Sequence, residues 1–101
     1  MKNACIEYLT EQLGDRDIAV EVYAEYAASF REKLAEARRS FDARDWRTLD
    51  FTVHTLKGNA LSAGDKEAAE TAIELRGAAQ LSDEGKASDL LSRLERMASE
   101  L

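Results

Sequence analysis

The sequence contains a single histidine, His54, and the residues that follow it suit chemistry on its ring. Histidine changes charge near neutral pH, so a large share of such rings is uncharged and nucleophilic. Lys57 lies close enough on a helix to place an ammonium beside an anion held on the ring. Gly58 costs about 1 kcal/mol relative to alanine in a helix, and its effect is to remove bulk beside the imidazole. Together these residues predict a site that accepts a phosphoryl group, for which positioning and charge stabilisation supply most of the catalysis.

The direction of His54 follows from the helix that we expect over residues 46–63. At about 100° per residue, the apolar residues of this segment fall within one arc, which must face the core. These residues are Leu49, Val53, Leu56, Ala60 and Ala63. His54 lies roughly 130° from the centre of the arc and therefore points outward. The residues on the same exposed side are Arg47, Asp50, Lys57, Gly58 and Leu61. The plainer alternative is that His54 and Lys57 are solvated surface residues.

The rest of the chain is also expected to be helical, because it has no proline, few β-branched residues and much Ala, Leu, Glu and Arg. Apolar residues recur at intervals of three and four, and Gly14 and Gly64 are typical helix stops. Asp15 or Asp17 is expected to cap the second helix, and Asp45 the third. The expected helices span 2–13, 15–43, 46–63, 66–80 and 87–101, with a loop over 80–85. Short connections favour antiparallel neighbours, so we predict an all-α, up-and-down four-helix bundle with a short N-terminal accessory helix, forming one domain over 1–101.

Composition excludes several classes of function. The formal net charge of −6 argues against binding to nucleic acid or to an anionic membrane. One cysteine, Cys5, cannot form an internal disulfide, and with one histidine it cannot make a usual zinc site. No apolar run is long enough to span a membrane, and the N-terminus does not read as a signal peptide. We therefore expect a reduced, cytoplasmic protein with no metal and no cofactor.

Residues 54–64, His-Thr-Leu-Lys-Gly-Asn-Ala-Leu-Ser-Ala-Gly, resemble the signature of histidine-containing phosphotransfer (HPt) domains. The shared features are the histidine, a Leu two residues later, Lys-Gly next and a Gly ten residues after the histidine. Given a histidine, the chance of matching Lys57, Gly58 and Gly64 is roughly 3 in 10,000. Asp65 departs from the family pattern, in which a small or apolar residue is common there, and this puts the local turn in doubt. Asn59 also stands at a position that is usually small.

The resemblance implies a phosphoryl carrier rather than an enzyme. His54 would take the phosphoryl group from an aspartate of a response-regulator receiver domain and pass it to an aspartate of another receiver. The receiver would supply the divalent metal, and a hybrid sensor histidine kinase would act upstream. Lys57 would offset phosphoryl charge, and Gly58 would admit the receiver's loops. The helix after Gly64 often supplies a polar side chain near the phosphohistidine, for which Arg76 and Gln80 lie on the correct flank.

Docking of a receiver is expected around the histidine. Leu61, one turn further along the exposed side, is expected to contact the partner, and Arg47 and Asp50 are further docking candidates. Phe51 is a docking candidate as well, but an uncovered Phe is costly on a monomer, so we expect the N-terminal helix to cover it. Gly64 is expected to be structural, as the helix terminator.

Two alternatives remain at this point. One is a helical adaptor or dimerisation bundle without phosphoryl chemistry, which would gain nothing from an exposed histidine beside Gly58. The other keeps the fold but makes the chain a phosphate sink or an HPt domain of a larger sensor kinase. The initiating Met1 and the length of 101 residues lead us to expect a free-standing protein, and we also expect it to be a monomer. No ATP-binding motif is found, so phosphorylation directly from nucleotide is not expected.

Overall fold

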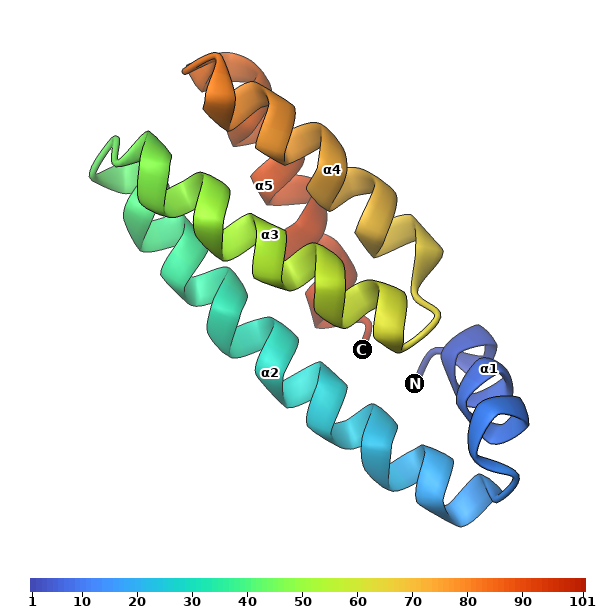
Figure 1. Cartoon of the computed structure of the whole chain (residues 1–101). Coiled ribbons are helices and arrows are strands. Elements are labelled where there is room, and N and C mark those ends of the chain that lie inside the picture. The colour runs from blue at the N-terminus through green and yellow to red at the C-terminus, as the bar shows by residue number, and fades with distance from the viewer.

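The computed structural model describes all 101 residues, and every regular element in it is an α-helix. The helices are α1 (Asn3–Leu13), α2 (Arg16–Asp42), α3 (Trp46–Ser62), α4 (Lys66–Gln80) and α5 (Glu84–Ser99). Figure 1 shows α2, α3, α4 and α5 side by side with alternating direction, and α1 set apart at the end where both termini lie. Helix α2 packs against α3 and α5, and α4 packs against the same two helices. The all-α bundle predicted from the sequence is therefore confirmed.

Aspartates begin four of the five helices. Asp15 and Asp45 cap α2 and α3, as expected, by accepting hydrogen bonds from backbone N–H groups of the first turn. Asp65 caps α4 in the same way, and Asp83 caps α5 by accepting from the N–H of Lys86 at 3.2 Å. The loop expected over 80–85 is consequently shorter, because Gln80 ends α4 and Glu84 already begins α5.

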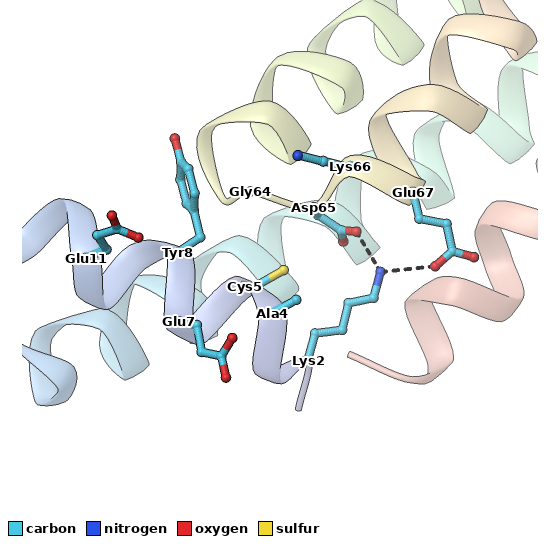
Figure 2. A pocket seen from close by; sticks show the side chains of 10 residues that line it. All are labelled: Lys2, Ala4, Cys5, Glu7, Tyr8, Glu11, Gly64, Asp65, Lys66 and Glu67. Atoms are coloured by element: carbon cyan, nitrogen blue, oxygen red, sulfur yellow. Dashed lines mark hydrogen bonds and ion pairs between the residues drawn. The ribbon is translucent and has the colours of Figure 1, made fainter.

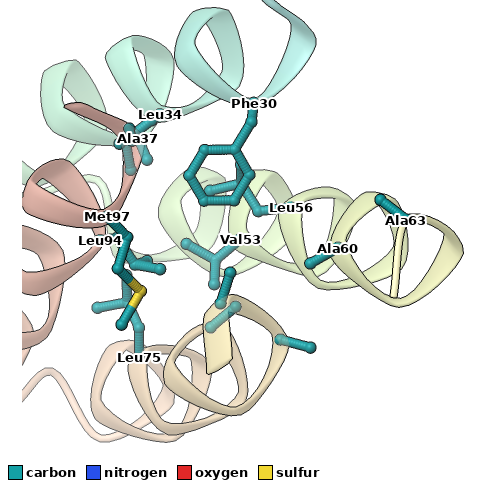
Figure 3. Packing of buried hydrophobic residues seen from close by; sticks show 14 of the residues in the cluster. Phe30, Leu34, Ala37, Val53, Leu56, Ala60, Ala63, Leu75, Leu94 and Met97 are labelled. Carbon is teal, nitrogen blue, oxygen red and sulfur yellow. The ribbon is translucent and has the colours of Figure 1, made fainter. Parts of the chain in front are cut away.

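The core lies along the centre of the bundle and contains 28 buried residues. Figure 3 shows Phe30 of α2 facing Val53 and Leu56 of α3, with Leu75 and Leu94 completing the contact. The predicted apolar arc of α3 is buried throughout. Its residues are 0–3% exposed: Leu49, Val53, Leu56, Ala60 and Ala63. Burial of this arc fixes the rotation of α3 about its axis and so determines which side chains of the helix face outward.

The N-terminal segment is held to the turn between α3 and α4 by Asp65 (Figure 2). Lys2 Nζ lies 2.6 Å from Asp65 Oδ1, and the hydroxyl of Tyr26 donates to Asp65 Oδ2 at 2.7 Å. The backbone N–H of Lys2 donates to the hydroxyl of Tyr23 at 2.9 Å. Burial raises the pKa of Tyr26, and its hydrogen bond to Asp65 raises it further. The structure removes the doubt that Asp65 raised about this turn: the side chain of Asp65 is only 3% exposed and joins three elements.

Gly64 is the residue that makes this turn possible. Its φ of 71° lies in the left-handed region, which favours glycine. A side chain at this position would also collide with the ring of Tyr8 on α1. Gly64 therefore ends α3 and also leaves the space in which Tyr8 of α1 packs against the bundle.

Cys5 provides a test of how firmly α1 is held. Its side chain is 1% exposed, and burial raises the pKa of its thiol to about 11, so the native protein should react slowly with a thiol reagent. Reaction then requires α1 to separate from the bundle. An Asp65→Asn variant loses the ion pair with Lys2 while keeping a good helix cap, and we expect its thiol to react about tenfold faster. Absorbance of released thionitrobenzoate measures the rate from the single cysteine.

The matched control for this experiment is Asp45→Asn. Asp45 caps α3 as Asp65 caps α4, but it is solvent-exposed and forms no hydrogen bond or ion pair with the N-terminal segment. Its substitution should leave the reaction rate of Cys5 unchanged. Equal rates in wild type and Asp65→Asn would mean that the contact with Lys2 does not hold α1.

No helix of the chain combines the length and the apolar character needed to cross a bilayer.

Candidate functional site

His54 lies on the outer face of α3, where its side chain is exposed to solvent. Its neighbours on the opposite face, Val53 and Leu56, are completely buried. The structure therefore confirms that His54 points outward, as the helix periodicity predicts. The ring is open to an approaching molecule rather than used in packing.

Arg76 of α4 reaches across to the imidazole. Its Nη1 lies 3.0 Å from Nδ1 of His54, and its Nε donates to Oδ1 of Asp50 at 2.8 Å. Gln80, one turn further along α4, places its amide nitrogen 3.5 Å from the same carboxylate oxygen. Both residues expected on this flank thus lie at the site, Arg76 against the ring and Gln80 against Asp50.

Asp50 belongs to this polar cluster. The sequence predicts a partner-docking role for this residue, but its side chain is only 28% exposed and its closest partner is Arg76. Asp50 precedes His54 by four residues, so the two lie on one face of α3. That spacing was visible in the sequence, whereas the pairing with Arg76 depends on how α3 and α4 pack.

The charge around His54 is positive although the whole chain carries −6. Lys57 is half-buried and Arg47 is exposed, and neither forms an ion pair. Arg76 is a third cation beside the ring, balanced by Asp50. Unpaired cations next to an exposed nucleophile favour an incoming anion.

Gly58 leaves an open space beside the histidine. A Cβ atom added at this position would have no neighbour within 4 Å, so packing between helices does not require the glycine. Gly77, which follows Arg76 on α4, is exposed and equally unobstructed. No local signal in the sequence marks Gly77, and its position matters only because Arg76 lies next to the histidine.

Large apolar side chains are exposed around the ring. On α3, Phe51 is 73% exposed and Leu61 is 54% exposed. The expectation that the N-terminal helix covers Phe51 is wrong, because α1 packs against α2 at the far end of the bundle. On α4, Ile73 is 52% exposed and lies one turn before Arg76; the sequence reasoning missed it. These residues give the histidine face an apolar component that suits contact with another protein.

The site is a surface rather than a cavity. The largest hollow, about 480 Å³, lies between α1 and the α3–α4 turn and is lined by Cys5, Tyr8 and Asp65, with no contribution from His54. A smaller groove between α2 and α3 is lined by Ser29 and Asn59, joined by a hydrogen bond of 3.4 Å. No three His, Cys, Asp or Glu side chains gather as ligands for a metal ion. An open face of this kind is suited to contact with a macromolecule rather than to a small enclosed substrate.

Comparison with known proteins finds a matching protein family. The family described as "Hpt domain" matches residues 21–101. This range includes His54 and all of α3, α4 and α5. No curated protein and no solved structure matches the chain. Helix α1 lies outside the matched region.

Proposed function

The chain belongs to the Hpt domain family, whose role is histidine phosphotransfer, and we propose that His54 is the residue that carries the phosphoryl group. In this proposal the imidazole accepts the group from an aspartyl phosphate of one receiver domain and gives it to an aspartate of another. The observation that carries the proposal is the exposed imidazole of His54 beside Gly58, at the position that the family signature assigns to the phosphorylated histidine.

The transfer is a substitution at phosphorus. A ring nitrogen of His54 forms the N–P bond while the P–O bond to the receiver aspartate breaks, and the bonding electrons leave with the carboxylate. The same step in reverse, on a second receiver, regenerates the free imidazole. The chain acts as a carrier, and the receiver brings the divalent cation. Lys57 and Arg76 lie where they can offset the charge of the phosphoryl oxygens.

The docking surface in this proposal surrounds the ring on two helices. Phe51 and Leu61 of α3 and Ile73 of α4 supply exposed apolar contacts, and Arg47 supplies a charge at the edge. Hpt domains interact with receiver domains of response regulators, and a hybrid sensor kinase is the proposed upstream source. We further propose that the chain acts in the cytoplasm as a monomer.

Transfer from phosphorylated receivers tests this function. Receiver domains from the same genome are labelled with radioactive phosphate on aspartate, freed of their kinase and incubated with the chain. We expect label to move to the chain from at least one receiver and to move on when a second, unlabelled receiver is added. The bound phosphate should be labile in acid and stable in alkali, as expected for a phosphohistidine. Failure of every receiver to transfer label, or label with the stability of an acyl phosphate, would contradict the proposal.

A further inference from the structure

The contact between Arg76 and the ring determines where the neutral imidazole holds its proton. Nη1 of Arg76 lies 3.0 Å from Nδ1 of His54. A guanidinium has five N–H donors and no acceptor, so the arginine must be the donor in this contact. Nδ1 is then the acceptor, and the single proton of the neutral ring resides on Nε2.

In this arrangement neither nitrogen is ready to attack phosphorus. The lone pair of Nδ1 is engaged by Arg76, and Nε2 carries a proton in place of a lone pair. Because Arg76 covers Nδ1, an incoming phosphoryl group reaches Nε2. Attack by Nε2 requires that the proton sit on Nδ1 instead, and a protonated Nδ1 donates a hydrogen bond, which Arg76 cannot accept.

Asp50 is the acceptor that the cluster offers. It lies one helical turn before His54 on the same face of α3. Its Oδ1 binds Arg76 and Gln80, while its Oδ2 forms no hydrogen bond within the protein. A carboxylate beside an imidazole favours the tautomer that donates to it and stabilises the charged ring that forms when the other nitrogen becomes a nucleophile.

We infer that Arg76 and Asp50 form a tautomer switch for His54, an inference that rests on the proposed function and deepens it. At rest, Arg76 holds the ring in the unreactive Nε2–H form. When a phosphoryl dianion arrives, Arg76 moves from Nδ1 to the phosphoryl oxygens, to which a guanidinium binds strongly. The ring then loses its Nε2 proton to water and takes up another from water at Nδ1, where Asp50 accepts the hydrogen bond.

The chemical step is balanced in this scheme. The Nε2 lone pair forms the N–P bond, the P–O bond to the receiver breaks, and its electron pair leaves on the receiver carboxylate. The ring keeps its Nδ1 proton, and Asp50 compensates the positive charge. Asp50 is thus a positioning residue that acts through the ring, whereas Arg76 touches the transferred group.

NMR of the single ¹⁵N-labelled histidine tests the resting state without any phosphodonor. At a pH where the ring is neutral, we expect the wild type to show the Nε2–H tautomer. In Arg76→Ala the proton should move to Nδ1, because Asp50 remains as acceptor. In the double variant Arg76→Ala, Asp50→Ala it should return to Nε2. Arg76→Lys, which keeps a donor, should resemble wild type, and Arg93→Ala on α5, whose nearest partner is Glu74 at 3.7 Å, serves as the matched control.

Phosphoryl uptake tests the second half of the switch. With phosphoramidate as a small-molecule donor, we expect Asp50→Ala to take up phosphate at least about tenfold more slowly than wild type. The phosphorylated wild type should carry its ring proton on Nδ1. The inference is overturned if the wild-type ring is Nδ1–H, if Arg76→Ala leaves the proton on Nε2, or if Asp50→Ala reacts at the wild-type rate. Since the tautomers are read without phosphate, failure of the relay itself would appear only in the transfer experiment.

Discussion

A His54→Gln variant is expected to accept no phosphoryl group from any receiver while folding as wild type does. The chain has no second histidine that could substitute, and the side chain of His54 contributes nothing to the core. Glutamine is neutral and of similar length, and its amide oxygen can accept the hydrogen bond from Arg76 that Nδ1 accepts now. The measurement is label transferred from a phosphorylated receiver over a time course in which wild type reaches completion.

Two further measurements make this result specific. Thermal unfolding should place the stability of His54→Gln within about 0.5 kcal/mol of wild type, as is usual for an exposed position. Arg96→Gln, on the exposed side of α5, is the matched control and should transfer at the wild-type rate. Phosphate uptake by His54→Gln at a rate similar to wild type would show that the phosphorylated residue is a different one.

The placement of His54 was predictable because it depends on local pattern alone. The apolar spacing of residues 46–63 sets the rotation of α3, and Asp45 sets where the helix begins. The fourth helix, expected over 66–80, is found as Lys66–Gln80 for the same reason. An apolar stripe has to face the core whatever the rest of the fold does, so such predictions need no knowledge of tertiary contacts.

The roles of Asp65 and Phe51 were not predictable in this way. Asp65 binds Lys2, 63 positions away, and Tyr26, 39 positions away. The local sequence around Asp65 indicates neither partner. These contacts place α1 at the α3–α4 turn, and that placement is why Phe51 stays uncovered. Without the ion pair between Lys2 and Asp65, the sequence led us to expect α1 in the wrong place. The expectation that α1 covers Phe51 was wrong for the same reason.

The polar cluster of Asp50, Arg76 and Gln80 could be predicted in part from the sequence. The resemblance to the family indicated that α4 supplies a polar residue, and Arg76 and Gln80 were the candidates. Which atom each one contacts depends on the register of α4 against α3, which the tight turn at Gly64 and Asp65 sets. The resulting contact of Arg76 with Nδ1 is what assigns the tautomer, and it is visible only in three dimensions.

Gly58→Glu should stabilise the fold and at the same time nearly abolish transfer. A Cβ at position 58 meets no atom within 4 Å, so the longer side chain fits without strain. Any helix-forming residue improves on glycine there, by up to about 1 kcal/mol in the case of alanine. The introduced carboxylate lies one turn from His54, where it fills the approach to the ring and repels the phosphoryl dianion. We expect initial rates of uptake to fall by about 100-fold or more.

Two other variants separate the causes of that loss. Gly58→Ala gains helix stability but adds only one methyl group, so it should lose less than about tenfold in rate. Gly85→Glu makes the same chemical change in the first turn of α5, which packs against α2 and α4 but not against α3, and it should transfer normally. Circular dichroism and thermal unfolding confirm that each variant is folded. Wild-type rates in Gly58→Glu would mean that the receiver does not approach over this glycine. A loss equal in Gly58→Ala and Gly58→Glu would instead point to the flexibility of the glycine backbone, because alanine leaves the space open and adds no charge.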